Sequence, residues 1–292
     1  IETMSKKLNP VDSDNIHYVP SMQEDVERIR SVTIDSIKRI YDEFVSGTHG
    51  EMTAVGSIDA DMIRETMSES LANWQTDQPY ERIPEVHFDF EPEDIKIETP
   101  DKANSVMIIS ATMPIRSDDP DFESMYVAND ILGGGGLASR LGDRVRQEKG
   151  LSYTIRSQFQ AEALDPAASF MTFAITNPAN RDALVATVME VFDEFLTGGV
   201  TEKELTAAKT QYAKAVEDML GNDQQLMGVL HQYLHYGRDE SFLRGRLDRM
   251  SSVTVEQVNS AANRLLNDKK FITVTAGDFA NAREEDKVKE KK

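Results

Sequence analysis

The chain has 292 residues, of which 39% are hydrophobic and 28% charged, as in a globular protein, and no apolar run approaches the roughly 18 residues of a membrane span. Its net charge of −19 repels phosphate backbones and argues against nucleic acid as a partner. The lack of cysteine excludes disulfides, thiolate nucleophiles and cysteine-bound zinc, and leaves both cytoplasm and periplasm open as compartments.

The first hundred residues predict helices, one short strand and an extended segment. In residues 22–45 apolar residues recur at spacings of three and four, which predicts an amphipathic helix that restarts at Thr33, a suitable N-cap. A strand is predicted over residues 51–56 and another helix over residues 59–73. Four prolines among acidic and aromatic residues then indicate an extended linker over residues 76–100.

From residue 101 onward, strand and helix signals alternate. The predicted strands cover residues 105–113, 153–160, 169–176 and 271–276. The predicted helices cover residues 122–132, 137–148 and 180–196, and further helices follow to about residue 266. Thr201 and Glu204 have the spacing of a capping box. The charged tail, residues 281–292, is expected to be disordered.

An internal duplication links the two ends of the chain. Residues 28–33 resemble residues 249–254, and the threonines that end these segments are 221 positions apart. Gly56 and Gly277, which follow the next strands, have the same offset of 221. A constant offset over about thirty residues indicates a repeat whose first copy would begin about 120 residues before Ile1. Residues 1–75 would then be only its closing part, unless they form an unrelated appendage.

One pair of histidines has a spacing found in metal sites. His231 and His235 lie four residues apart, so on a helix both could reach one zinc ion. Helical zinc-peptidase motifs also need a glutamate beside one of the histidines, but the two candidate positions hold Gln232 and Leu234. Two histidines without a metal are therefore the favoured interpretation, and an independent His231/His235 metal enzyme is the least favoured one.

A run of four glycines follows the helix predicted over residues 122–132. The run consists of Gly133, Gly134, Gly135 and Gly136. It is no phosphate loop, because a lysine followed by serine or threonine is missing after it. Its free N–H groups suit a hinge or an edge that contacts a peptide, and a simple turn between helices fits equally well.

The stretch after the glycines is the most distinctive one in the chain. A basic amphipathic helix ends near Gly150 and leads into a strand that is predicted to start with Tyr153. This arrangement would bring Arg146 close to Tyr153, where both side chains could donate hydrogen bonds to a peptide carbonyl. The alternative is that Arg146 pairs with Glu148 or Asp143 while Tyr153 fills the core.

At this stretch the sequence resembles the pitrilysin/insulinase family of zinc peptidases, also called inverzincins. The resemblance reaches from Val32-Thr33 to about residue 280. Its segments are Val32-Thr33 with the later Gly56, Thr99-Pro-Asp-Lys-Ala-Asn104, Ile131-Leu-Gly-Gly-Gly-Gly136, Ser139-Arg140-Leu141 and Arg146 through Tyr153. The segment from Arg146 to Tyr153 is the most specific of them.

The resemblance implies an α+β fold in which a mixed β-sheet is covered by helices. Members are built from pairs of similar domains, so residues 101–280 would form one complete domain and residues 1–75 the C-terminal part of a preceding one. The family's zinc motif, His-x-x-Glu-His, belongs to an N-terminal domain and does not occur in this sequence. No metal ligand or other cofactor is therefore expected in this chain, and zinc is expected in the rest of the complete enzyme.

The resemblance also implies a function. A C-terminal domain of the family supplies an arginine that holds the substrate backbone and a tyrosine that stabilises the tetrahedral oxyanion, and these roles fall on Arg146 and Tyr153. The chain is then the substrate-binding part of a metallopeptidase for peptides or small unfolded proteins, and it is inactive alone. Its partner would be a zinc-bearing N-terminal segment or subunit. The alternative is a non-catalytic scaffold or partner subunit of the same fold.

Overall fold

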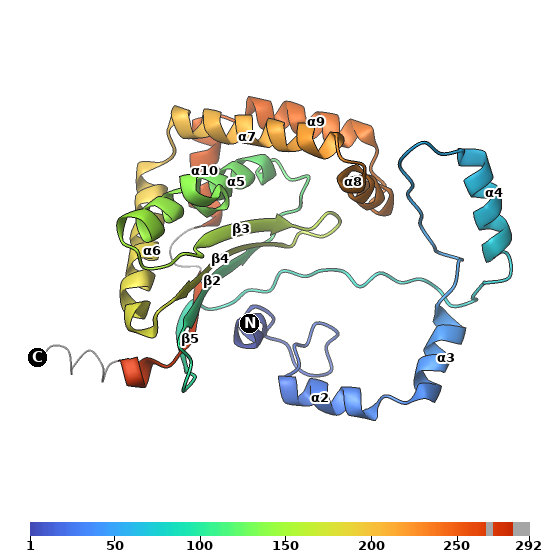
Figure 1. Ribbon diagram of the computed structural model, residues 1–292, viewed down its shortest axis with the longest axis horizontal. Helices are drawn as coiled ribbons and strands as arrows, with labels where there is room; N and C mark the ends of the chain where they lie inside the picture. Colours follow the sequence, from blue (N-terminus) through green and yellow to red (C-terminus); the bar gives the residue numbers. More distant parts are fainter. Residues whose placement is uncertain (267–270, 283–292) are drawn as a thin grey trace, which may run out of the picture. The chain divides into compact units, whose positions relative to one another are not determined.

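The computed structural model describes residues 1–266 and 271–282, so most of the predicted disordered tail lies outside the described residues. The chain forms two compact units (Figure 1). The sheet unit consists of Ile1–Val19, Glu85–Gln211 and the described residues from Asp248 onward. The helical unit consists of Pro20–Pro84 and Tyr212–Leu247. Among the described residues no helix is long and apolar enough to cross a membrane.

The sheet unit is built on a five-stranded mixed sheet with the order β1-β5-β2-β4-β3. β1 runs parallel to β5, and the other neighbours are antiparallel. The strands are β1 Glu93–Glu98, β2 Ser105–Met113, β3 Arg156–Ala161, β4 Ala168–Thr176 and β5 Ile272–Gly277. The structure confirms the predicted α+β class with a mixed sheet, and β2 has the predicted bounds.

Helices cover one face of this sheet, and every second residue of a strand points toward them. In β4, Phe170, Thr172 and Ala174 are fully buried, whereas Met171 and Phe173, which alternate with them, are only half-buried. Phe170 packs against Phe192 of the covering helix layer and against Phe271. The helices of this layer are α5 Phe122–Asn129, α6 Arg181–Gly198 and α10 Val255–Leu265, and α10 packs against α5 (Figure 1).

The opposite face of the sheet is covered in part by the N-terminus. Met4 of helix α1, Glu2–Leu8, is buried together with Ile108, Ile272 and Val274 of the sheet. Helix α1 therefore belongs to the sheet unit, although the helical unit begins soon after it in the sequence, at Pro20.

Helices make up the regular structure of the other unit. The predicted break at Thr33 is confirmed, because its hydroxyl accepts from Ser36 N (3.1 Å) while the Ser36 side chain accepts from Thr33 N. The same capping box, with Thr254 and Gln257, begins α10, the counterpart of α3 at the offset of 221. The helices are α2 Met22–Ser31, α3 Ile34–Phe44, α4 Ala60–Leu71, α8 Asp223–His235 and parts of α7 Glu202–Leu220 and α9 Glu240–Ser252.

The strand predicted over residues 51–56 is wrong, because this segment is irregular in the structure. A strand is stable only beside a hydrogen-bonded neighbour. The helical unit, as far as it is described, contains no strand. Side chains tie the segment to α8 instead: Thr53 Oγ1 lies 3.3 Å from His231 Nδ1, and Glu51 Oε2 lies 3.0 Å from His235 Nδ1.

Two predicted helices around the glycines have other bounds in the structure. α5 ends at Asn129 and continues as a wider π-helical turn, Asp130–Gly134. The next helix starts only after Ser139, whose backbone is extended, and is mostly π-helical over Gly142–Glu148. The Ser139 hydroxyl donates to Gly136 O (2.6 Å) and accepts from the Gly142 N–H (3.1 Å), which fixes this delayed start.

Candidate functional site

The turn that contains the four glycines packs tightly on the start of β3. A Cβ atom at Gly133 would lie 2.4 Å from Ser157 Oγ and 2.7 Å from Ser157 N, so only glycine fits there. Ser157 also donates a hydrogen bond to Asn129 Oδ1 (2.8 Å), which joins β3 to the end of α5. Gly136 has a positive φ of 66° with open space around it. Gly133 thus has a packing role, which the sequence alone did not reveal, whereas Gly136 provides a left-handed backbone conformation.

The basic residues of the following helix differ in their partners. Arg144 pairs with Glu148 (3.0 Å) and Glu194 (3.0 Å), and Lys149 pairs with Glu190 (3.2 Å). Arg146 is exposed and forms no ion pair with any residue that the structure describes. The alternative in which Arg146 pairs with Glu148 or Asp143 is therefore not found.

The guanidinium of Arg146 lies over the ring of Tyr153 instead. Its Cζ atom is 5.9 Å from the ring centroid, within the range of a cation–π contact. Tyr153 is 78% exposed, so the alternative in which it fills the core is also not found. The structure brings together the two residues that the sequence singled out, and both side chains are open to solvent.

Tyr153 lies in a short loop, and β3 begins three residues later, at Arg156, so the prediction of a strand from residue 153 is wrong. The loop is fastened to β4 on both sides of Tyr153. Ser152 Oγ donates to Ile175 O (2.7 Å), and Thr154 Oγ1 accepts from Ile175 N (2.9 Å). These side-chain bonds hold the loop backbone away from strand pairing and direct Tyr153 outward.

A charged network that the sequence did not predict anchors the start of the arginine-bearing helix. Arg140 donates from Nε to Glu204 Oε1 (2.8 Å) and from a terminal nitrogen to Gly199 O (2.7 Å). Glu204 also accepts from the Thr201 N–H (2.8 Å), which confirms the predicted capping box. Partial burial alone would raise the pKa of Glu204, but the hydrogen bonds from Arg140 and Thr201 outweigh it and lower the pKa to about 2.

The lowered pKa predicts a pH-dependent contribution to stability. A depressed carboxyl pKa stabilises the fold above the usual value of 4.5, and this contribution is lost as the pH falls toward 2. We expect Glu204→Gln to lower the free energy of unfolding by about 2 kcal/mol at pH 7, with the difference shrinking steadily below pH 4.5. Urea denaturation across this pH range measures it. Glu202→Gln, at an exposed position of the same helix, is the control, and a difference independent of pH would contradict the assignment.

The two histidines do not form a zinc site with their neighbours. The Nδ1 atoms of His231 and His235 contact Thr53 and Glu51, respectively. Within residues 1–266 and 271–282, no three His, Cys, Asp or Glu side chains gather in a way that could hold a metal ion. The residues present here do not fit a zinc ion.

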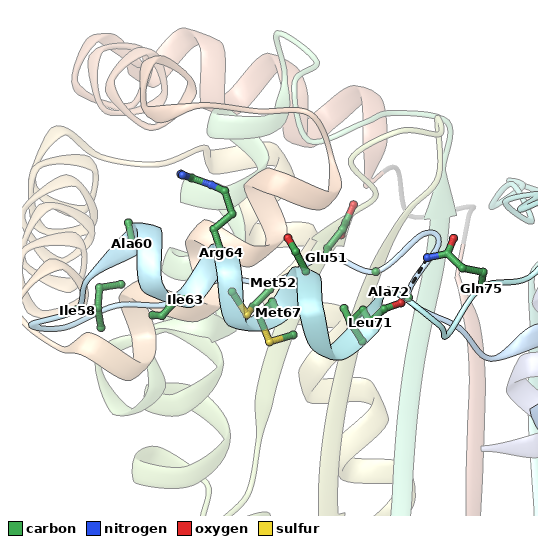
Figure 2. A pocket seen from close by; sticks show the side chains of 14 residues that line it. Glu51, Met52, Ile58, Ala60, Ile63, Arg64, Met67, Leu71, Ala72 and Gln75 are labelled. Carbon is green, nitrogen blue, oxygen red and sulfur yellow. Dashed lines mark hydrogen bonds between the residues drawn. The ribbon is translucent and has the colours of Figure 1, made fainter.

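The structure adds a groove that the sequence did not indicate. It has a volume of about 650 Å³ and lies in the helical unit, between α4 and the irregular segment before it. Figure 2 shows that its labelled side chains are mostly apolar and come from both of these segments. They include Met52, Ile58, Ile63, Met67 and Leu71, with Glu51 and Arg64 as the charged members.

Known proteins resemble this chain over most of its length. The family description "Peptidase M16 inactive domain" matches residues 31–212. An uncharacterized zinc protease of Mycobacterium leprae is 31% identical over 149 residues, which make up 51% of this chain and 33% of that protein. The non-peptidase homolog YmxG of Helicobacter pylori is 22% identical over 255 residues, covering 85% of this chain and 57% of that protein.

A solved structure agrees with the fold. The crystal structure of a peptidase M16 inactive domain from Pseudomonas fluorescens superposes with a TM-score of 0.80 at 26% identity. The match covers 94% of this chain and 64% of that chain. The chain thus spans between a third and two thirds of the length of these relatives.

Proposed function

Since the chain belongs to the M16, or pitrilysin-type, peptidase family, we propose that it is the substrate-binding, non-zinc part of a zinc metallopeptidase that cleaves peptides or small unfolded proteins. Relatives named zinc proteases support the activity of the complete protein. The chain spans only part of their length, so the zinc ligands are expected elsewhere, in an N-terminal segment or a partner subunit. We expect the described chain to be inactive by itself.

The pair of Arg146 and Tyr153 carries this proposal. Of the four basic residues between Ser139 and Tyr153, Arg146 is the one that forms no ion pair within the described part of the chain. The guanidinium of Arg146, which has no carboxylate partner among the described residues, and the 78% exposed phenol of Tyr153 contribute little to the stability of the fold. Their contact buries little apolar surface and does not neutralise the charge of Arg146. The pair is a good arrangement for binding a ligand that offers hydrogen-bond acceptors.

A peptide backbone offers such acceptors. The Arg146 guanidinium has five N–H donors in a planar fork and can hold backbone carbonyl oxygens of an extended peptide. The Tyr153 hydroxyl can donate to the scissile carbonyl oxygen as it becomes an oxyanion, which makes Tyr153 the catalytic residue of this chain. Backbone N–H groups of the turn at Gly133, Gly134, Gly135 and Gly136 would contact the peptide further along.

A second function is a non-catalytic scaffold or partner subunit of the same fold. It is favoured by the relative from Helicobacter pylori, which is named a non-peptidase homolog and matches 85% of this chain. A scaffold has no use for a solvent-exposed pair of Arg146 and Tyr153, and this is why the substrate-binding role is preferred.

Zinc analysis and a fluorogenic peptide assay on the complete protein distinguish the two functions. If the complete protein is a peptidase, we expect it to contain zinc and to cleave the peptide, and a chelator should abolish the cleavage. Zinc and cleavage should both be retained when His231 and His235 are replaced by alanine together. If the complete protein has neither bound zinc nor peptide cleavage, the result would favour the scaffold function. Loss of zinc in the double histidine variant would contradict the assignment of the metal to another part of the protein.

A further inference from the structure

Two arginines of the sheet unit differ from the others in what they contact. Of the eight arginines in the described residues of this unit, six form an ion pair with a carboxylate, namely Arg116, Arg140, Arg144, Arg181, Arg249 and Arg264. Arg146 and Arg156 form no ion pair with any described residue. The chain has 51 acidic against 32 basic side chains, so two neighbouring arginines without a carboxylate mark a local excess of positive charge.

Arg156 repeats the arrangement of Arg146. Its Cζ atom lies 5.7 Å from the centroid of the Phe173 ring, and that of Arg146 lies 5.9 Å from the centroid of the Tyr153 ring. A ring that contacts one face of a guanidinium leaves the N–H donors in the plane of the group open to a ligand. Arg156 is exposed, so these donors face solvent.

The place of Arg156 on β3 directs its side chain to the open face of the sheet. Side chains alternate along a strand, and Ser157 and Phe159 are buried against α5. Arg156, Gln158 and Gln160 are exposed and form a polar row on the opposite face. β3 is an edge strand with β4 as its one neighbour in the sheet (Figure 1), so this row is not enclosed by strands on both sides.

Arg156 is close to the proposed site along the chain. It follows Tyr153 by three residues, so the Cα atoms of the two residues are at most about 11 Å apart. Three residues of an extended peptide span the same length. A peptide whose scissile carbonyl lies at Tyr153 can therefore bring a group that is about three residues away from that bond to Arg156.

We infer that Arg156 is a specificity-determining residue that binds a carboxylate of the peptide substrate, within about three residues of the scissile bond. This inference rests on the proposed substrate-binding function. The carboxylate belongs to an acidic side chain or to the C-terminus of the peptide, since the guanidinium fork fits both. The net charge of −19 repels an anionic peptide, but charges more than roughly 8 Å away are largely screened at physiological ionic strength, so the nearest arginines dominate.

Paired fluorogenic peptides test this inference on the complete protein. Each peptide is neutral except for one glutamate, placed at one of the three positions on either side of the cleaved bond, and its partner has glutamine there. At the best position kcat/KM should be about 5- to 10-fold higher for the glutamate peptide. Arg156→Gln should reduce this ratio to about 1, and Arg156→Lys should retain part of it.

A second set of peptides identifies the source of the carboxylate. These peptides end within three residues of the cleaved bond and have either a free or an amidated C-terminus. A preference for the free C-terminus that depends on Arg156, without a preference for glutamate, would assign the C-terminal carboxylate as the ligand. The reverse result would assign an acidic side chain.

Arg116→Gln is the matched control. It removes the same charge from an exposed arginine of the same unit, but Arg116 already pairs with Asp118 (2.9 Å). The control should leave the preference for a carboxylate unchanged. Equal kcat/KM with and without a carboxylate in both sets of peptides would overturn the inference and leave the peptidase function intact. The same holds for a preference that survives Arg156→Gln or is lost equally in Arg116→Gln.

Binding measurements separate this inference from the proposed function. If the complete protein cleaves no peptide, the peptidase function fails, and the same peptides, labelled with fluorescein, serve as binding probes. Their Kd values from fluorescence anisotropy should then show the preference for a carboxylate and its dependence on Arg156. Binding without this preference, or no binding, would overturn the inference as well.

Discussion

Replacing Tyr153 with phenylalanine is expected to lower the kcat of the complete protein by about 100- to 1,000-fold while KM changes little. A single oxyanion donor contributes roughly 3–4 kcal/mol to the transition state and little to the ground state, so its loss affects the rate rather than substrate binding. The measurement is steady-state hydrolysis of a fluorogenic peptide by the complete protein.

The fold should tolerate the change at Tyr153. The side chain is 78% exposed, and the bonds that fasten its loop come from Ser152 and Thr154. The Tm should therefore stay the same, and the Arg146–ring contact remains possible with phenylalanine. Tyr80→Phe, which alters an exposed tyrosine of the helical unit, is the control. Full activity of the Tyr153→Phe protein would remove this residue from the mechanism.

Replacing Arg146 with alanine is expected to lower kcat/KM by about 10- to 100-fold. Hydrogen bonds from a charged donor contribute roughly 1.5–3 kcal/mol, and Arg146 has its charge available because it forms no ion pair in the described part of the chain. Part of the loss should appear as a higher KM, since the guanidinium would hold the peptide backbone before as well as during the reaction.

Arg144 provides the matched control for Arg146. It lies on the same helix, two residues earlier, but Glu148 and Glu194 already bind its guanidinium. Arg144→Ala should therefore leave kcat/KM within about a factor of three, while costing up to about 1 kcal/mol of stability. Equal effects of the two substitutions on kcat/KM would show that general positive charge, rather than the position of Arg146, serves the substrate.

Local sequence patterns determined much of the secondary structure. The N-cap at Thr33 and the capping box at Thr201 were predicted from residue type and spacing alone, because each depends only on side chains within one helical turn. The apolar run of β2 likewise predicted a strand with the bounds found in the structure. The neighbourhood of Arg146 and Tyr153 followed from the short chain between them, which cannot separate the two side chains widely.

Features that depend on distant neighbours were decided by the tertiary structure. Residues 51–56 and their counterparts in β5 have similar strand signals, but only β5 has strands on both sides to bond its backbone. The carboxylates that neutralise Arg140 and Arg144, Glu204 and Glu194, come from helices more than forty residues away. The sequence determined which residues were available. Packing decided which backbone segment found a strand partner and which arginine found a carboxylate, because both hydrogen bonds and ion pairs act only over a few ångströms.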